Sequence, residues 1–271
     1  MSASLEDAGP LAIPPHATGF GFSLRRSGGH MSRSMMLPEL RLLFAAVPAT
    51  AGRAAYRAAI LEGNVLGKPT FSSRQKSEKH LYELYGVDPS LALFRLLRRF
   101  AAEAPDSLPL LALTCVFCRD PQLRASFTLI EALKPGEVLL RARTEAHLES
   151  VFPERFSPIM LAGLATRVGV TWAATGHLKG RATRTRTLPI PTPAASTYAM
   201  FAGYLLGLRG DCLVSSVFAR LVGADPALIL SHLALGSQRG WLRLRHGGGV
   251  IEIDFAALLL PAEEAILNGP R

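Results

Sequence analysis

Apolar residues recur at helical spacing along most of this chain. From Leu37 onward, for example, Leu40, Leu43 and Phe44 fall on one face, and Pro48 ends the pattern. Comparable patterns predict helices over residues 51–63, 73–85, 90–104, 107–120, 120–133 and 157–176, and residues 137–151 continue in helical register after Gly136. Strand-like alternation is scarce and short Pro or Gly turns separate the segments, so the pattern favours a mainly α-helical bundle.

The helix expected at residues 73–85 begins with cations. Thr70 or Ser72 is a suitable N-cap for it, and Gly86 is a suitable stop. A short helix, a turn and a second helix that starts with basic and hydroxyl side chains is the order of a helix-turn-helix motif. The candidates for contact with base edges and phosphates on this helix are Ser73, Arg74, Gln75, Lys76 and Lys79.

The segment at residues 157–176 has an apolar stripe and is followed by a basic strip. Its predicted buried stripe is Ile159, Leu161, Leu164, Val168 and Trp172. The strip that follows, "HLKGRATRTRTLP", alternates residue by residue as a short β-strand would.

The last third of the chain has the clearest order of elements. It reads as a helix at residues 213–221, then a helix at 225–236 that Asp225 caps and Pro226 begins. Two alternating strands, "WLRLR" and "VIEIDF", follow and are joined by three glycines, residues 247–249. Two helices and a glycine-tipped hairpin are the order of a winged helix.

We therefore expect a mainly α fold: a helical bundle with helix-turn-helix and winged-helix elements and few short β-hairpins. The expected organisation is a loosely ordered tail at residues 1–17, an N-terminal helical domain with the helix-turn-helix at 18–150, and a C-terminal winged-helix-like domain at 151–271. Residues 20–36 are expected to form a loop or arm that leads into the first helix.

Charge points to a polyanionic partner. Lys and Arg number 30 against 21 Asp and Glu, which gives a net charge of +9 and a pI near 10. Such a balance favours nucleic acid, here double-stranded DNA, because clustered cations neutralise phosphates. A GC-rich genome, which supplies Arg and Ala freely, is the alternative explanation.

The residues give little support to an enzyme, a metal site or a cofactor. Cys115 and Cys118 have CxxC spacing but lie inside an apolar run, so we interpret them as core residues. The seven histidines lack metal-ligand spacing, and no phosphate-binding glycine loop occurs. We expect a non-enzymatic protein without cofactor or metal. An odd count of three cysteines, and no apolar run near the ~20 residues of a membrane span, favour a soluble cytoplasmic protein.

Three segments concentrate the cations, at residues 68–80, 177–187 and 238–246. Each alone is most often a solvated face, but three at the ends of helices or the starts of new elements favour phosphate contacts. Arg243 and Arg245 fall on one face of their strand, with Leu242 and Leu244 on the other. The candidates from the second and third segments are Lys179, Arg181, Arg184, Arg186, Arg239, Arg243 and Arg245.

Three stretches resemble the BrxA family of BREX bacteriophage-exclusion systems. They are "AAILEGNVLGKPTFSSRQKSEKHLYELY", "LPLLALTCVFCRDPQLRASFTL" and "WAATGHLKGRATRTRTLPIPTP", and the resemblance covers roughly residues 18–195. It implies a helical, non-enzymatic DNA-binding protein that works beside a DNA adenine methyltransferase and other defence proteins. The positions that would face DNA are Lys68, Thr70, Ser72, Ser73 and Arg74. Residues from about 200 onward extend past the usual end of that family.

Two other functions fit the same residues. A scaffold could dock its basic faces onto acidic surfaces of partner proteins, and a stand-alone winged-helix regulator would prefer one operator. DNA binding within a defence system is the leading hypothesis.

Overall fold

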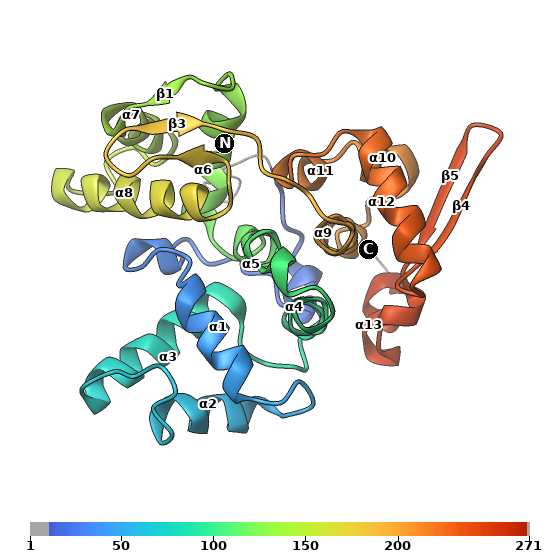
Figure 1. Cartoon of the computed structure of the whole chain (residues 1–271), viewed down its shortest axis with the longest axis horizontal. Helices are drawn as coiled ribbons and strands as arrows, with labels where there is room; N and C mark the ends of the chain where they lie inside the picture. Colours follow the sequence, from blue (N-terminus) through green and yellow to red (C-terminus); the bar gives the residue numbers. More distant parts are fainter. Residues whose placement is uncertain (1–10, 270–271) are drawn as a thin grey trace.

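A computed structural model describes residues 11–269 of the chain. These residues are mainly helical, with two small antiparallel sheets. Figure 1 shows three lobes around a central group of helices, α4 (Ala92–Glu103), α5 (Leu108–Phe117) and α9 (Pro193–Leu205). The expected mainly α-helical fold is confirmed.

The first lobe contains α1 (Leu37–Ala46), α2 (Arg53–Leu61) and α3 (Phe71–Tyr85). Thr70 is the N-cap of α3, since its hydroxyl accepts a hydrogen bond from the Ser73 amide at 3.1 Å. Gly86 ends α3 in the left-handed conformation, at φ 60°. Both signals were predicted. Residues 62–70, which join α2 to α3, make a longer connection than the three- or four-residue turn usual in a helix-turn-helix.

The central helices are the most buried part of the chain. Every residue of α5 except Pro109 is buried, including Cys115, and Cys118 directly after the helix is 0 % exposed. Burial raises the pKa of the Cys115 thiol to about 11. The interpretation of Cys115 and Cys118 as core residues is confirmed.

The second lobe contains α6 (Pro121–Ala132), β1 (Val138–Leu139), α7 (Arg141–Val151), α8 (Pro158–Ala174), β2 (Leu178–Lys179) and β3 (Arg184–Arg186). The sheet order is β1-β3-β2, and both pairings are antiparallel. Two predictions were wrong here. Residues 138–139 are a strand rather than part of a helix, and the basic strip is a hairpin rather than one strand. Local periodicity could not show either, because β1 pairs with a strand more than forty residues away.

Ile159 was predicted on the buried stripe of α8, but it is 88 % exposed. Leu164, Val168 and Trp172 on the same stripe are buried as expected. The first turn of α8 extends beyond the elements that cover the rest of the helix, since residues 157–160 are all exposed. Periodicity gives the phase of a helix but not how far its neighbours reach.

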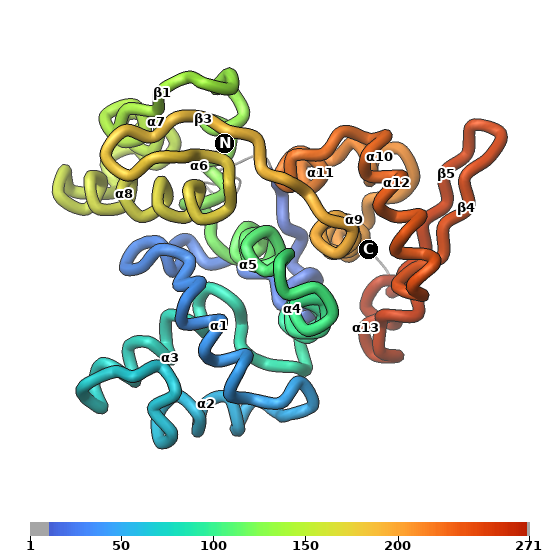
Figure 2. The backbone as a smooth tube through the Cα atoms, in the orientation of Figure 1, coloured from blue at the N-terminus to red at the C-terminus, as the bar shows by residue number. Residues whose placement is uncertain are grey.

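The third lobe contains α10 (Gly210–Val214), α11 (Val217–Leu221), α12 (Pro226–Gln238), β4 (Arg243–Gly247), β5 (Val250–Asp254) and α13 (Pro261–Asn268). Asp225 caps α12, as predicted. The single helix predicted at 213–221 is instead two short helices. The glycine-tipped hairpin is confirmed, with Gly248 and Gly249 at positive φ, and Figure 2 shows it projecting from the body.

The predicted domain limits, at residues 17 and 150, can be compared with the burial and strand pairing of the residues around them. Residues 1–10 of the expected tail lie outside the described residues, and Ala17 is buried within a short 3-10 helix, Pro15–Phe20. β1 pairs with β3 across the expected boundary at residue 150, and one hydrophobic core runs from Ala17 to Leu258. The β1–β3 pair and the hydrophobic core therefore both extend across residue 150.

Within residues 11–269, no helix is by itself both long and apolar enough to span a membrane. Gly210–Leu221 and Pro226–Gln238 meet that length and composition only together, as a pair bent by 98°.

Residues 22–36, here called the arm, pass between the first and second lobes (Figure 2). The junction between α5 and α6 holds the arm in place. The Gln122 side chain accepts a hydrogen bond from the Gly28 amide at 2.8 Å and donates one to the Arg26 carbonyl at 2.9 Å. Arg119 donates to the carbonyls of Gly21 and Tyr82. The arm is thus attached to both lobes through one buried turn of chain.

Asp120 joins the arm to the first turn of α6. Its carboxylate accepts hydrogen bonds from the backbone amide and ring of His30, at 2.8 and 3.0 Å, and from the Leu123 amide at 2.9 Å, which caps α6. Burial opposes ionisation of Asp120, but the charge and hydrogen bonds of His30 outweigh it and hold the pKa of Asp120 below its usual value. The His30 ring is fully buried and also meets Thr171 on α8.

Replacing Gly28 with Ala tests this attachment. A Cβ at Gly28 would lie 2.2 Å from Asp120 Oδ2, so we expect Gly28→Ala to lower the free energy of unfolding by about 1–3 kcal/mol. Gly247→Ala is the control, because nothing lies within 4 Å of a Cβ there. Chemical denaturation measures both, and equal stability of the two variants would contradict the prediction.

Candidate nucleic-acid interface

The three basic segments predicted from the sequence do not form one surface. Figure 1 shows α3, the β2–β3 hairpin and the β4–β5 hairpin at three separate corners of the molecule. Each segment therefore has to be judged by its own contacts.

In the α3 segment, several predicted contact residues are engaged with the protein. Lys68 Nζ lies 3.0 Å from Glu39 Oε1, and the side chains of Thr70 and Ser73 form a reciprocal capping box. Arg74 donates to the Leu61 carbonyl at 2.7 Å, and Lys79 lies 4.0 Å from Glu83. The exposed candidates without such a partner among the described residues are Ser72, Gln75 and Lys76.

The β2–β3 hairpin divides its four cations between solvent and core. Lys179 and Arg181 are exposed at the tip, and no carboxylate in residues 11–269 pairs with either. Arg184 is half-buried and lies against α8, where a Cβ at Gly169 would be 2.0 Å from its Nη1. Arg186 is only 8 % exposed. The prediction that all four contact phosphates is therefore wrong for Arg186.

Arg186 helps to build the hairpin instead. It donates to the His177 carbonyl at 3.1 Å and to the Thr187 carbonyl at 2.5 Å. His177 is itself fully buried, with Nε2 donating to the Leu221 carbonyl at 2.9 Å and Nδ1 2.9 Å from the Thr175 hydroxyl. Burial, and then the positive charge of Arg186, lower the pKa of His177 to about 3. His177 therefore stays neutral in the folded protein.

In the β4–β5 hairpin, the arginines of β4 lie opposite acidic residues of β5. Arg243 and Arg245 are exposed on one face, as predicted, but they pair in register with Asp254 and Glu252 on β5. Arg245 Nη1 lies 3.4 Å from Glu252. Arg239 is exposed beside the Trp241 ring, at 5.0 Å from its centroid. Cross-strand acids thus offset much of this predicted patch.

The arm holds a cationic group that the sequence reasoning missed. Arg25, Arg26 and Arg33 are exposed, and none has a carboxylate partner in the described part of the chain. Arg155 donates to the Arg26 carbonyl at 2.6 Å, and Arg167 donates to the His30 carbonyl at 2.6 Å. A signal was present, because no Asp or Glu occurs between Asp7 and Glu39.

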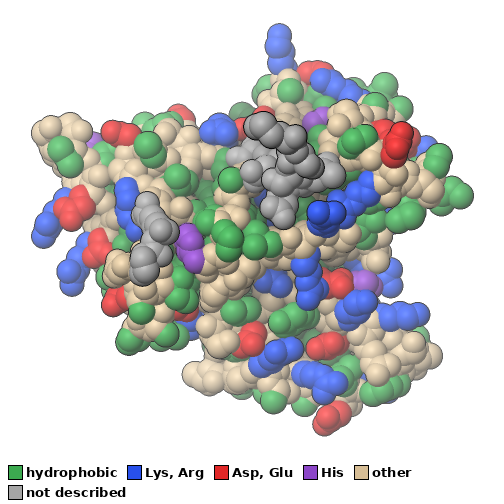
Figure 3. Space-filling model, turned by 180° about the vertical axis from the view of Figure 1, so that it is seen from behind, with side chains coloured by type: hydrophobic (Ala, Val, Ile, Leu, Met, Phe, Trp, Pro, Cys, Tyr) green, Lys and Arg blue, Asp and Glu red, His purple; other side chains and the backbone are tan. Residues whose placement is uncertain are grey.

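Seen from behind, Lys and Arg side chains recur near the junction of the first and second lobes, with few acidic side chains among them (Figure 3). The arm runs through that junction, so its cations add to those of the two lobes it joins.

A buried Thr171–His30–Asp120 chain has the order of a catalytic triad. The Thr171 hydroxyl lies 2.7 Å from His30 Nε2, and His30 Nδ1 lies 3.0 Å from Asp120. All three residues are at most 1 % exposed, and Thr171 Oγ1 also accepts a hydrogen bond from the Met35 amide. A substrate could not reach Thr171, so the chain serves to anchor the arm.

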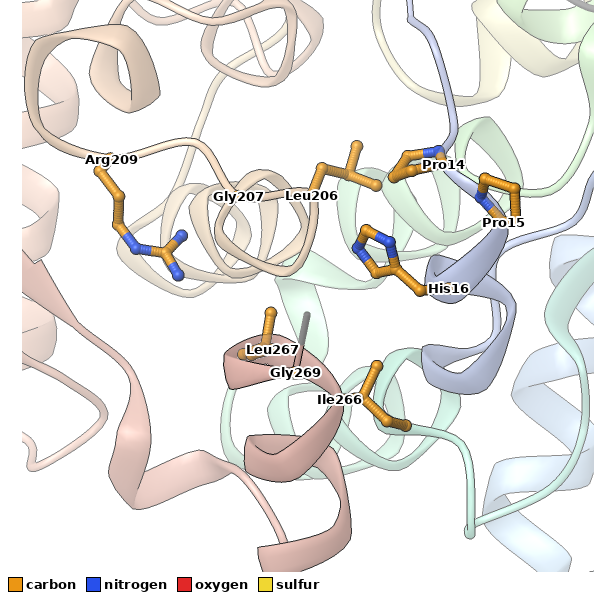
Figure 4. Close-up of a pocket in the computed structure, with 9 residues that line it drawn as sticks. All are labelled: Pro14, Pro15, His16, Leu206, Gly207, Arg209, Ile266, Leu267 and Gly269. Atoms are coloured by element: carbon orange, nitrogen blue, oxygen red, sulfur yellow. The ribbon is translucent and has the colours of Figure 1, made fainter. Parts of the chain in front are cut away.

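No group of three or more His, Cys, Asp or Glu side chains in residues 11–269 is placed to hold a metal ion. A cavity of about 430 Å³ opens between the 3-10 helix at Pro15 and α13 (Figure 4). Its lining residues are Pro14, Pro15, His16, Leu206, Gly207, Arg209, Ile266, Leu267 and Gly269. They are mostly apolar, and they include no nucleophile paired with a base.

The buried His177 predicts a pH dependence of stability. Because the pKa of His177 is about 3 in the folded protein and near 6.5 in the unfolded chain, only the unfolded chain takes up a proton as pH falls through 6.5. Between pH 7 and pH 5 we expect His177 to cost about 2 kcal/mol of stability. Denaturation of the wild type and of His177→Gln at both pH values measures this difference. Parallel losses in the two proteins would contradict it.

Comparison with known proteins adds no family. A scan of the sequence against protein-family models and a search of curated proteins both give no match.

Proposed function

We propose that this protein binds duplex DNA without catalysing a reaction, as an accessory component of a BREX-like phage-defence system. The observation that carries the proposal is the β2–β3 hairpin, which follows three helices and exposes Lys179 and Arg181 without a carboxylate partner among residues 11–269. Phosphate binding gains most from cations that the protein does not already neutralise.

The order of elements in residues 121–187 supports this proposal. Helix α6, strand β1, helices α7 and α8, and the β2–β3 hairpin follow one another, and β3 pairs with β1 and β2. We propose that these elements form a winged helix, in which the third helix and the hairpin face DNA. In this interpretation α8, rather than the predicted α3, is the recognition helix.

The resemblance to the BrxA family supports the biological setting. We propose double-stranded DNA as the main partner, with other defence proteins, such as a DNA methyltransferase, as further partners. The contact surface includes Lys179 and Arg181, and Ser72, Gln75 and Lys76 of α3 are secondary candidates.

Salt dependence tests DNA binding directly. We expect a fluorescent duplex to bind at 50 mM salt and its affinity to fall steeply at 200 mM, because binding releases counterions. The double variant Lys179→Ala/Arg181→Ala should reduce the slope of log affinity against log salt by about 2, without a change in thermal stability. No binding at low salt, or an affinity independent of salt, would rule out the proposed function.

A second function is favoured for the third lobe alone. Helix α12 contains no charged residue, and its exposed surface includes Leu228 and Leu235, at 37 % and 42 % exposed. Helices α9 to α12 and the β4–β5 hairpin again follow a winged-helix order, but an uncharged helix suits a protein partner better than phosphates. We propose that this lobe docks a protein of the same defence complex.

Pull-down from cells that carry the defence genes tests that second function. We expect a defence-system protein to be captured by the wild type after nuclease treatment, and to be lost with Leu228→Asp/Leu235→Asp because carboxylates would disrupt an apolar contact. Retention by the variant, or loss after nuclease treatment of the wild type, would argue against protein docking at α12.

A further inference from the structure

Helix α8 presents an uncharged ridge to solvent. Ile159, Gly163, Thr166 and Val170 follow one another at spacings of four, three and four residues, which places them on one face of the helix. Ile159 is 88 % exposed and Val170 is 42 % exposed. The opposite face, with Leu164, Val168 and Trp172, is buried in the second lobe.

Arginines stand on both sides of this ridge. At about 100° per residue, Arg167 lies roughly a quarter turn to one side and Gly169 roughly a quarter turn to the other. Arg167 is held by its hydrogen bond to the His30 carbonyl, and the arm places Arg33 close to it. The Arg184 guanidinium lies against Gly169 on the opposite side.

The same arrangement continues at both ends of α8. Before its first turn, Arg155 is fixed to the arm by hydrogen bonds to the Arg26 carbonyl and the Ser27 hydroxyl, at 2.6 and 3.1 Å. After its last turn, the hairpin presents Lys179 and Arg181. The cations therefore border an uncharged helix surface along its whole length.

Holding these cations together has an electrostatic cost. Burial, followed by the charge of Arg33, lowers the pKa of Arg167, and burial, followed by the charge of Arg26, lowers the pKa of Arg155. Burial also lowers the pKa of Arg184. The hydrogen bonds of Arg155 and Arg167 go to neutral carbonyl and hydroxyl groups, and no carboxylate in the described residues is paired with either. An anion would relieve this repulsion.

From this geometry we infer that α8 lies in the major groove of duplex DNA, with Arg33 and Arg167 on the phosphates of one strand and Arg184 on those of the other. This inference rests on the proposed function and names the surface that performs it. A helix of 10–12 Å diameter matches a groove about 12 Å wide, and the two backbones border that groove as the arginines border the ridge.

The ridge also indicates what α8 can read. Ile159 and Val170 offer apolar contact to thymine methyl groups, and Thr166 supplies a hydroxyl, but no ridge residue makes a bidentate contact with guanine or adenine. Most of the affinity should therefore come from phosphates, and sequence preference should be weak. An acidic protein surface is the alternative occupant, and the experiment below separates the two.

Two pairs of variants test the inference by fluorescence anisotropy with a labelled duplex. The first pair compares Arg26→Gln/Arg33→Gln with Arg41→Gln/Arg57→Gln, which removes two exposed cations from α1 and α2. We expect the arm variant to weaken binding on the order of tenfold at 100 mM salt, and to reduce the salt slope by at least about 1, because the phosphate contact of Arg33 is lost together with the charge of Arg26. The α1–α2 control should keep the wild-type slope.

The second pair introduces one carboxylate, by Thr166→Glu on the ridge or by Ala45→Glu at an exposed position of α1. Thr166→Glu should abolish measurable binding, since a carboxylate in the groove would face both backbones, while Ala45→Glu should bind as the wild type does. Thermal unfolding confirms that each variant is folded.

The outcomes separate the two hypotheses. If the wild type binds DNA, and the arm variant and Thr166→Glu both bind it with wild-type affinity, the assignment of α8 and the arm is wrong. The proposed function then still stands. If the wild type does not bind duplex DNA at 50 mM salt, the proposed function fails. Capture of an acidic protein, lost in both variants, would then identify the alternative occupant and overturn the inference.

Discussion

The buried turn between α5 and α6 is the constraint on which the rest of the structure depends. Arg119 donates hydrogen bonds to the carbonyls of Tyr82 in α3 and of Gly21, which directly precedes the arm. Asp120 caps α6 and accepts hydrogen bonds from His30. Gln122 bonds the Arg26 carbonyl and the Gly28 amide of the arm. Each polar group there is buried, so leaving one unpaired would cost on the order of 1–3 kcal/mol. The first lobe, the second lobe and the arm therefore keep one mutual arrangement.

That arrangement explains how the arm, which contains no Asp or Glu, becomes part of the cationic surface beside α8. Free in solution, Arg26 and Arg33 would move away from other cations. In the folded protein, the backbone of the arm is held by Asp120, Gln122, Arg155 and Arg167, so the arginines remain beside α8 despite their like charges. The stability of the buried junction thus supports an exposed cluster that would not gather by itself.

The fates of the predicted cations show why charge in a sequence is not charge on a surface. Arg186 is enclosed by the hairpin that it helps to build, and Arg245 meets Glu252 across the β4–β5 pair. Lys179 and Arg181, from the same strip as Arg186, remain exposed. Lys179 ends the edge strand β2 and Arg181 lies in the turn that follows, whereas Arg186 belongs to β3, the central strand of the sheet.

The sequence by itself determined the elements whose signals are local. Thr70 and Asp225 cap the helices they were expected to cap, Cys115 and Cys118 lie in the core, and the glycines at 247–249 turn a hairpin. These features depend on residues a few positions apart, where hydrogen bonding and periodicity act directly. Only the tertiary structure decided that Val138 and Leu139 form a strand, that Ile159 is exposed and that the arm lies beside α8. Each of these depends on contacts between residues far apart in the chain, and a local pattern carries no record of which distant segment will supply its partner.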